Sequence, residues 1–581
     1  MKKFILLTSI TIILLIKTLA YGDINIVNHT LIIDGKENRI ISRFLIEVSQ
    51  EKSLIFSSSA EIKEILVANQ KVPFSKNPSG NIYIANLPTY QNRITVEVRV
   101  NYEIVKEINK NAMVVLSEVM RTLPNLEVQN QKYIDSTVVI TNMPNDIKIF
   151  DGNTVITNVK EETRKYSTPL CLGYFNLFSY SQNNIQFKVI ILEGKEEIGL
   201  NLISWLRTAL QFINYLGTEA KYKTVNIIYY ENAEISESIL NNIIISRLYK
   251  PEGNEYFKNI DSLQNFITLT HELLHLMLPE EIGNDIIDII EGFIQFLAIE
   301  SLEYTFGNSY PKELVYNSYF ITLNNYKKSE NELALVRYRK YPLVFRYINS
   351  IVGKAQLESL FKFLSKQNAI TTQIFEKAFS DLTGLSFRNF RELFDGIPTL
   401  WELSLIVSEN EAKILSTAPI EIVVPLEIFL DDTNYTISAE IPKSGSTNIM
   451  LPNNVKSLIL NKGRIFPEQT MANNFLNLKI PPHLTRYLTI LEDIINSEQI
   501  SISKYSKSLS KKVQKNIKSI KLTKKIIFGE RYVKIVPEHF YRSEEDIIIY
   551  ASLTTLFKST YSVIVISFGQ GYYIKDFIIL Y

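Results

Sequence analysis

Apolar and polar residues alternate along much of the chain between residue 23 and about residue 195. The stretches 44–48 and 94–100 show this alternation clearly, and both are rich in β-branched residues. Turn residues such as Asp34-Gly35 interrupt the pattern. A period of two with such interruptions is typical of β-strands that bury one face. We therefore expect an N-terminal β domain over residues 23–195.

After this β-rich region the period of the pattern changes to that of a helix. Residues 200–216 carry apolar side chains at helical spacing, and Gly217 follows as a stop signal. A strand pattern at 224–230 comes next, and helical patterns then dominate from 263 to 394. The sequence thus predicts a second, mainly helical domain over residues 196–400.

Strand patterns return after Pro398. They include 420–424 and 457–460, and they predict a β-sandwich-like domain over residues 401–475. Residues 476–581 are expected to form a basic helical segment and a small β unit. The fold class that these patterns indicate is α+β and multidomain, with β regions at both ends and a helical domain between them.

The composition is that of an ordinary globular protein, and it excludes few functions. The chain has 581 residues, too many for a single core, with 46% hydrophobic residues and a formal net charge of +1. A charge so close to zero gives no general attraction to nucleic acid, so we expect no nucleic-acid partner. Cys171 is the one cysteine of the chain, and we expect it to be a small buried residue rather than half of a disulfide.

The first 22 residues have the pattern of a secretory signal peptide. Two lysines precede an apolar run over residues 4–16, and small residues follow at Ala20 and Gly22. The run is shorter than the roughly 20 residues that a membrane-spanning helix needs. We therefore expect export, periplasmic or secreted, with cleavage after Ala20 or Gly22. The alternative is an uncleaved signal that keeps the protein anchored to the membrane.

Two of the five histidines, His271 and His275, stand four positions apart, and Glu272 directly follows the first. Residues four apart lie one turn above each other on a helix, so both imidazoles can reach the same metal ion. This H-E-x-x-H arrangement is typical of zinc hydrolases, in which the glutamate takes a proton from the zinc-bound water. We therefore predict that His271 and His275 bind zinc and that Glu272 is the general base.

A catalytic zinc site needs a third protein ligand and an open position. Glu291 lies 16 positions after His275, in the predicted helix 286–302, and turn residues between the two helices allow them to pack side by side. We therefore expect Glu291 to complete a site for one Zn²⁺ per chain. The alternative is a helix that buries two histidines and a carboxylate without a metal, which is costly for polar groups that lack partners.

The H-E-x-x-H motif at 271–275 and the Glu-Gly-Phe segment at 291–293 resemble those of the gluzincin zinc metallopeptidases. The likeness is strongest to the aminopeptidase N family, with the glycyl aminopeptidases as a second match. Residues 338–345 are similar to the family's Y-x-K-G-A-L-V-L segment. The resemblance implies a thermolysin-like catalytic domain. It also implies that the hydroxyl of Tyr338 stabilises the oxyanion of the tetrahedral intermediate, a role that suits a phenol donor.

The chain departs from the aminopeptidase N family at several places, and two of them bear on the site. The family usually has a longer stretch between the second histidine and the ligand glutamate than the 15 residues that separate His275 from Glu291 here. The family's G-x-M-E-N segment, whose glutamate holds the free amine of a substrate, has no clear counterpart. Residues 236–243 take its place in the order of the chain, and Glu237 is the acidic residue among them. The choice between exopeptidase and endopeptidase action therefore stays open.

The sequence thus predicts an exported, zinc-dependent metallopeptidase that hydrolyses bonds in a peptide or protein substrate, with aminopeptidase action as one mode. Two alternatives remain. One is a catalytically degenerate peptidase fold that serves as a binding or scaffold protein, and the other is a zinc hydrolase of a non-peptide substrate. The lysine-rich segment from Lys504 to Lys525 is expected to be a solvated face, with weak contact to anionic surfaces as the alternative.

Overall fold

The structure is a computed structural model that describes residues 24–580 apart from a set of gaps. The gaps are 38, 49–52, 59–60, 78–81, 88–92, 102–107, 109–112, 117–124, 127–135, 167–168, 183, 219–220, 232–235, 240, 247–254, 325–331, 409–410, 431–432, 453–454, 456, 462–464, 469–481, 497–504, 506, 529–533, 543–545, 555–558 and 568–572. The chain packs as two units, one with residues up to 207 and 220–248, the other with 208–219 and 249 onward. The predicted signal peptide at 1–22 lies outside the described residues.

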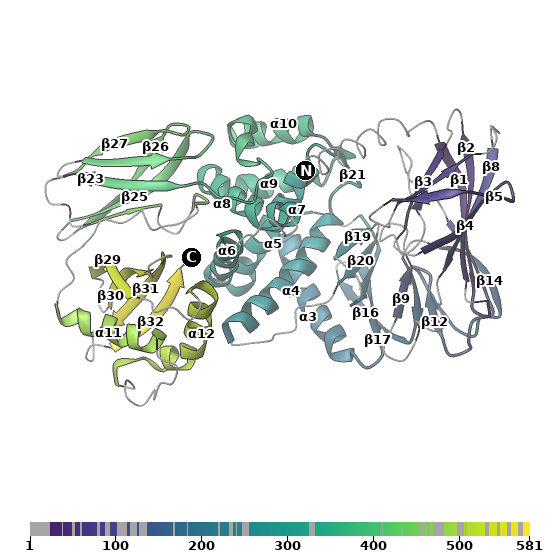
Figure 1. Cartoon of the computed structure of the whole chain (residues 1–581), viewed down its shortest axis with the longest axis horizontal. Helices are drawn as coiled ribbons and strands as arrows, with labels where there is room; N and C mark the ends of the chain where they lie inside the picture. Colours follow the sequence, from purple (N-terminus) through teal and green to yellow (C-terminus); the bar gives the residue numbers. More distant parts are fainter. Residues whose placement is uncertain are drawn as a thin grey trace. The chain divides into compact units, whose positions relative to one another are not determined.

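The first unit begins with three β-sheets (Figure 1). Their strands are β1 (Ile24–Asp34), β2 (Arg39–Val48), β3 (Ser53–Ser57), β4 (Glu61–Val67), β5 (Gln70–Val72), β6 (Phe74–Lys76), β7 (Ile82–Asn86), β8 (Arg93–Asn101), β9 (Met113–Leu116), β10 (Asn125–Leu126), β11 (Ser136–Thr141), β12 (Lys148–Phe150), β13 (Val155–Ile156), β14 (Glu161–Tyr166) and β15 (Leu170–Gly173). The sheet orders are β14-β11-β1-β2-β8-β4-β5, β10-β3-β7-β6 and β13-β12-β15-β9. Phe44 and Ile46 of β2 are buried whereas Arg43 and Glu47 are exposed. This is the alternation expected of a sheet with one face on the core.

A five-stranded sheet with the order β16-β17-β18-β20-β19 also belongs to the first unit. Its strands are β16 (Phe175–Gln182), β17 (Ile185–Leu192), β18 (Thr224–Tyr229), β19 (Glu237–Ile239) and β20 (Asn242–Ile245). Strands β17 and β18 are parallel, so the chain needs a crossover between them, and helix α3 (Glu196–Tyr215) supplies it. Glu237, the candidate for binding a substrate amine, lies in the edge strand β19, opposite Ile244 of β20.

Helices dominate the middle of the second unit (Figure 1). They are α4 (Glu255–His275), α5 (Ile287–Phe306), α6 (Tyr310–Asn324), α7 (Glu332–Leu335), the π-helical turn η1 (Val336–Lys340), α8 (Tyr341–Val352), α9 (Lys354–Leu364), α10 (Thr372–Thr383), and the 3-10 turns η2 (Phe387–Asn389) and η3 (Arg391–Leu393), with the short strands β21 (Glu281–Ile282) and β22 (Ala369–Ile370). Between Ile289 and Leu302 of α5, every residue except Glu291 is buried. A helix that is apolar on nearly all sides is expected in a core. Helix α5 is therefore the central helix of this group.

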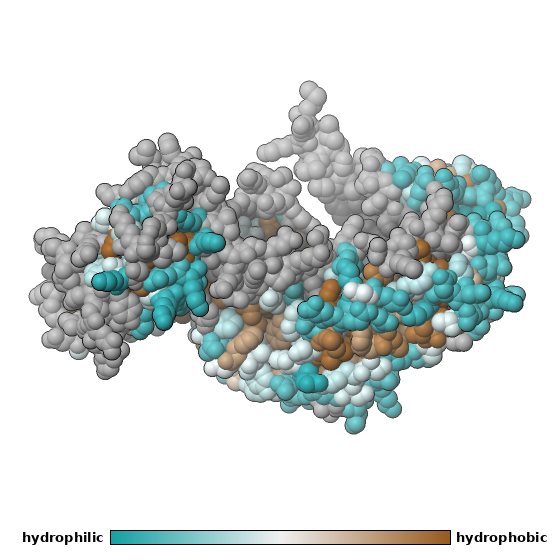
Figure 2. Space-filling view, turned by 90° about the horizontal axis from the view of Figure 1, so that it is seen from below, coloured by the Kyte–Doolittle hydropathy of each residue, from teal (hydrophilic) through white to brown (hydrophobic). Residues whose placement is uncertain are grey.

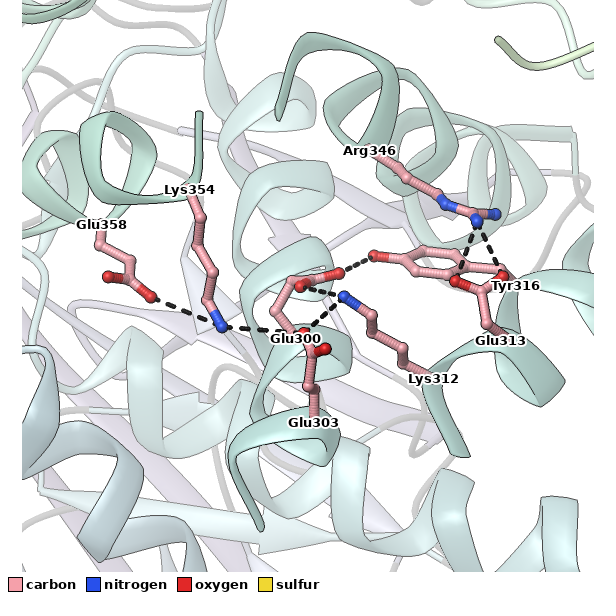
Figure 3. Close-up of polar contacts among 8 residues, drawn as sticks. All are labelled: Glu300, Glu303, Lys312, Glu313, Tyr316, Arg346, Lys354 and Glu358. Carbon is pink, nitrogen blue, oxygen red and sulfur yellow. Dashed lines mark hydrogen bonds and ion pairs between the residues drawn. The ribbon is translucent and has the colours of Figure 1, made fainter. Parts of the chain in front are cut away.

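Charged and phenolic side chains join the second half of α5 to its neighbouring helices (Figure 3). Glu300 is 2% exposed, and it accepts hydrogen bonds from Lys312 Nζ at 2.8 Å and from the Tyr316 hydroxyl at 2.9 Å. Lys312 also donates to Glu303 at 2.7 Å. The other residues of the network are Glu313, Arg346, Lys354 and Glu358. A buried carboxylate with these partners avoids the cost of an unpaired charge, so the network stabilises the position of α5.

Two three-stranded sheets follow the last helices in the chain (Figure 1). One consists of β23 (Leu403–Ser408), β24 (Glu411–Ser416) and β27 (Ser446–Met450), and the other of β25 (Ile422–Phe429), β26 (Asn434–Ile441) and β28 (Ser457–Leu460). They contact the helices through Tyr347 of α8. Its hydroxyl accepts a hydrogen bond from the backbone N–H of Val423 at 2.9 Å, and its ring lies 5.0 Å from that of Phe466. The sheets are thus packed directly on the helical part.

The C-terminal part contains two helices and a four-stranded sheet. These are α11 (Pro482–Asn496), α12 (Lys511–Phe528), β29 (Lys534–Arg542), β30 (Asp546–Thr554), β31 (Ser559–Ser567) and β32 (Tyr573–Leu580). Helix α12 buries Val513 and Ile517 on one side, whereas Lys511, Lys515 and Lys518 are exposed. Over its described residues, the lysine-rich segment is therefore an amphipathic helix whose apolar side belongs to a core.

The described part of the surface carries both hydrophobic and hydrophilic residues. Seen from below, hydrophobic patches lie among hydrophilic residues on the described part of the surface (Figure 2). Exposed large apolar side chains include Leu200 and Met450, and scattered cases of this kind are normal for a folded protein. Within the described ranges, no helix has the length and apolar character that crossing a membrane requires.

The structure confirms a mixed α/β fold with several sheets and more than one packed unit. The predicted strand stretches 44–48 and 94–100 fall inside β2 and β8, and the predicted helix 286–302 corresponds to α5. The domain bounds taken from the sequence, including the one at 195, stay a prediction.

Candidate metal centre

The last turn of α4 carries both histidines of the H-E-x-x-H motif. The helix ends at His275, and the Nε2 atoms of His271 and His275 lie 3.0 Å apart. His271 is only 5% exposed, so its ring is held by the protein interior rather than by solvent. This is the geometry expected of two side chains one helical turn apart.

Helix α5 brings Glu291 to the two histidines. One carboxylate oxygen lies 3.3 Å from His271 Nε2, and the other lies 3.4 Å from His275 Nε2. A tetrahedral ion with ligand bonds of about 2.0–2.2 Å keeps neighbouring ligand atoms roughly 3.3 Å apart. Across the described residues, this is the one group of three or more His, Cys, Asp or Glu side chains with ligand atoms this close together. The spacing therefore fits a single metal ion.

The protonation states of these side chains also fit a cation. Burial lowers the pKa of His271, which favours the neutral imidazole that a metal ligand requires. Burial alone would raise the pKa of Glu291, but the neighbouring His275 and the contacts with both histidines hold it well below 4.5. The Oε2 atom of Glu291 is buried and accepts no hydrogen bond from the described residues. A buried anionic oxygen that has a histidine nitrogen 3.3 Å away but accepts no well-formed hydrogen bond is the kind of atom that a bound cation would satisfy.

A π-helical turn places Tyr338 beside the histidines. The turn η1 is closed by a hydrogen bond from the backbone N–H of Tyr341 to the carbonyl of Val336, five residues earlier. The rings of Tyr338 and His271 meet edge to face with their centroids 5.7 Å apart. Turns of this kind are rare in proteins, and those that occur are often found at functional sites.

Two carboxylates influence the hydroxyl of Tyr338. Burial raises the pKa of this phenol, and the nearby Glu291 and Glu272 raise it further. The hydroxyl therefore remains protonated in the neutral range and can donate a hydrogen bond. Glu272 itself lies in α4 directly after His271 and is 5% exposed. The structure thus brings together the three candidate ligands His271, His275 and Glu291, the candidate base Glu272, and Tyr338, whereas Glu237 lies in the first unit.

Gly292 allows α5 to approach the start of α8 closely. A Cβ atom added to Gly292 would lie 2.3 Å from the Cβ atom of Tyr341, where ordinary contacts begin at 3.4 Å. The Tyr341 Cβ is attached directly to the backbone, so no change of rotamer can move it away. The distance between Glu291 and the Tyr338 turn therefore depends on residue 292 being a glycine.

A second set of contacts joins His271 to the tyrosine turn through Gln295 and Tyr319. The side chain of Gln295, one helical turn after Glu291, lies against His271 and donates a hydrogen bond to the Tyr319 hydroxyl at 2.7 Å. The guanidinium of Arg339, the residue after Tyr338, lies 4.3 Å from the centre of the Tyr319 ring. Contacts behind a ligand histidine fix the orientation of its ring.

The fold places the site in the context of a known structure. The chain shares its fold with an aminopeptidase. Its structure matches the crystal structure of Legionella pneumophila aminopeptidase A in complex with aspartic acid, with a TM-score of 0.55 and 13% sequence identity. The match covers 86% of this chain and 68% of the Legionella chain. No protein-family model matches the sequence, and no curated protein matches it either.

Sequence reasoning named the His271, His275 and Glu291 group but missed the residues that support it. The position of Gln295, four after Glu291 in a helix, is a signal that it shares a face with the ligand. The close approach at Gly292 and the π-helical turn have no comparable signal, because each depends on how two distant elements pack. Glu237 lies in β19 of the first unit, and its role in substrate binding stays a prediction.

Proposed function

We propose that this protein is a zinc-dependent metallopeptidase with aminopeptidase action. The observation that carries the proposal is the arrangement of His271, His275 and Glu291, whose ligand atoms lie 3.0–3.4 Å apart. Two histidines and one glutamate, with a glutamate directly after the first histidine, are a ligand set of catalytic zinc sites in peptidases. The likeness of fold to an aminopeptidase supports the peptide bond as the target.

The residues of the chain divide the chemistry between them. His271, His275 and Glu291 would hold the ion, which when bound acts as a Lewis acid and lowers the pKa of water. Glu272 takes the proton from the attacking water and passes it to the leaving amine. The Tyr338 hydroxyl donates a hydrogen bond to the oxygen on which negative charge develops, and burial keeps that hydroxyl protonated.

We further propose that the protein is exported. Residues 1–22 carry the charged, apolar and small-residue parts of a signal peptide in the usual order. N-terminal sequencing of the mature protein would then begin at Tyr21 or Asp23. A mature protein that still begins at Met1 would point to the anchored alternative.

The decisive experiment combines metal analysis with cleavage of a mixed peptide library. Purified protein is assayed with and without a zinc chelator, on matched peptides with free and with acetylated N-termini. We expect one zinc per chain and chelator-sensitive removal of single residues from free N-termini. Glu272→Gln should keep zinc and lose hydrolysis, whereas Glu281→Gln, at an exposed position of β21, should keep both.

Other outcomes lead to different conclusions. Chelator-sensitive internal cuts would mean that the protein is an endopeptidase, with the same hydrolytic residues. Bound zinc with cleavage of esters but not of peptides would mean a different substrate class. Bound zinc with no hydrolysis of any substrate would contradict the proposal and favour a binding role for the fold.

A further inference from the structure

Lys340 is an unusual residue because its charged side chain is completely buried. It ends the π-helical turn η1, two positions after Tyr338, and its side chain has an exposed fraction of 0%. Lysine is almost never buried to this extent unless its charge is paired. Burial also lowers the pKa of Lys340, and the neighbouring Asp395 opposes that change. The fold therefore bears a cost to keep an ammonium group at this position.

The ammonium group of Lys340 contacts three partners. Lys340 Nζ donates to the carboxylate of Asp395 at 2.6 Å and to the backbone carbonyl of Ile397 at 2.8 Å. It also lies 4.3 Å from the centre of the Trp401 ring, within the range of a cation–π contact. All three partners belong to the segment 395–401, which leads from the last helices into the β23–β28 sheets. One buried charge thus joins this segment to the tyrosine turn.

The segment 395–401 is itself firmly held. Asp395 accepts a hydrogen bond from the backbone N–H of Ile397 at 3.0 Å, so the same carboxylate shapes the turn and binds the lysine. Trp401 packs against Phe466 at 5.6 Å, and Phe466 packs against Tyr347 of α8. Lys340 is therefore attached to a rigid point rather than to a loose loop.

The tyrosine turn needs such an attachment. π-helical turns are rare and occur mostly as single turns inside α-helices, so α-helical winding is the competing conformation of this segment. A change to that winding would rotate the following residues and move the Tyr338 ring away from His271. At the opposite side of the turn, Arg337 forms an ion pair with Asp288 in the first turn of α5. Arg337 thus ties the start of the turn to α5, and Lys340 ties the end of the turn to the segment 395–401.

We propose that Lys340 is a positioning residue that holds the π-helical turn so that the Tyr338 hydroxyl points into the metal centre. The proposal rests on the proposed function for the role of Tyr338. It adds that the segment 395–401, and through it the β23–β28 sheets, contributes to turnover without touching substrate. In this proposal Lys340 affects turnover only through the position of Tyr338. Removing the Tyr338 hydroxyl should therefore remove the effect of Lys340 on turnover.

The test is a double-mutant cycle of Lys340→Met and Tyr338→Phe in the full-length, zinc-loaded protein. Lys340→Met should lower kcat by about 10- to 100-fold with little change in KM or zinc content, since a displacement of about 1 Å has effects of this size. In the Tyr338→Phe background the same substitution should change kcat less than about twofold, because the group that it positions is already gone.

A second readout does not need turnover. The affinity of acetohydroxamate, a small metal-binding probe, is measured by calorimetry for the same four proteins. Tyr338 can donate a hydrogen bond to a probe oxygen, so both single variants should bind more weakly and the double variant no more weakly than either. If no peptide is cleaved but this coupling is found, the proposed function fails while the positioning role stands.

Lys312→Met is the matched control. Lys312 is a second mostly buried lysine in the same unit, and its partners Glu300 and Glu303 lie on the other half of α5. It should lower stability but leave kcat and probe affinity nearly unchanged. Hydrogen exchange of a peptide covering η1 should become faster in Lys340→Met and not in Lys312→Met.

Two results would overturn the proposal. One is an unchanged kcat in Lys340→Met, and the other is an equal loss of kcat from Lys340→Met with and without the Tyr338 hydroxyl. If Lys340→Met does not fold, Asp395→Asn replaces it in the cycle. That variant keeps an oxygen acceptor but weakens the hold on the ammonium group, and the same coupling is then expected at a smaller size. Additive effects of Asp395→Asn and Tyr338→Phe would equally reject the role of Lys340.

Discussion

Replacing Gly292 with alanine tests whether the spacing of two helices sets the geometry of the candidate metal centre. The new Cβ atom would lie 2.3 Å from that of Tyr341, so α5 and the start of α8 have to separate by about 1 Å to reach an ordinary contact of 3.4 Å. Such overpacking costs about 1–3 kcal/mol, and the better helix propensity of alanine offsets about 1 kcal/mol of it. The net loss of stability is therefore only about 0–2 kcal/mol.

Activity should respond far more strongly than stability. Glu291 belongs to α5, and Tyr338 belongs to the turn η1 that leads directly into α8. A displacement of about 1 Å between catalytic groups lowers turnover by about 100-fold. Urea unfolding of the zinc-loaded protein measures the first effect, and kcat on the best library peptide measures the second. A variant that is about 1 kcal/mol more stable than wild type and fully active would refute the reasoning, because it would show that the space at Gly292 is not limiting.

The double variant with Tyr341→Gly is the control for this prediction. The three atoms nearest to the added methyl group all belong to the Tyr341 side chain and are absent in this variant, so the two substitutions together should be less harmful than the sum of their separate effects. Loss of the Tyr341 ring, which packs 4.9 Å from Phe394, destabilises both backgrounds and cancels in the cycle. Strictly additive effects would mean that Gly292→Ala acts elsewhere.

Three further predictions concern single groups. Tyr338→Phe should lower kcat by about 10²–10³-fold, the loss typical for an oxyanion donor, while zinc content stays at the wild-type value; unchanged turnover would remove Tyr338 from the mechanism. Cys171 should react with a thiol reagent only after unfolding, because it is buried and burial raises its pKa; rapid reaction of native protein would contradict this. The hydrogen bond from Lys312 lowers the pKa of Glu303 below 4.5, so their pairing stabilises the fold above that pH and is lost as the pH falls through the lowered pKa. Urea unfolding measures the stability difference between wild type and Lys312→Met. This difference should be steady across the neutral range, from about pH 6 to about pH 8, and should shrink on acidification. A difference that grows in acid would contradict the prediction.

The group of His271, His275 and Glu291 was accessible from sequence because its geometry is local. The helical repeat alone brings His271 and His275 to one face, and Glu291 needs only a turn between two adjacent helices to join them. The mixed α/β fold was accessible for a similar reason, since periods of two and 3.6 residues mark each element where it occurs. Tyr338 was named through resemblance to a family segment and not through its position on a helix.

The supporting contacts were beyond the reach of sequence because they join distant parts of the chain. Lys340 and Asp395 are 55 positions apart, and neither sits in a pattern that marks it as buried. The close approach of Gly292 to Tyr341 depends on the packing of two helices, which periodicity does not specify. The π-helical turn needs the same tertiary contacts, because a run such as Val336–Lys340 is compatible with an ordinary α-helix.

The order of the site residues along the chain has a consequence for folding. His271 and Glu291 are 20 positions apart, so the loop that the ligand set closes is short and its entropic cost is small. Tyr338 and the segment 395–401 come much later and join the site only when helices distant in sequence dock. On the proposed zinc site, an ion held by α4 and α5 would therefore stabilise this helix pair early, as a folding nucleus, and its binding free energy would add to that of folding. Chelation would then loosen the protein at the centre of its second unit first, while the sheets of the first unit stay folded.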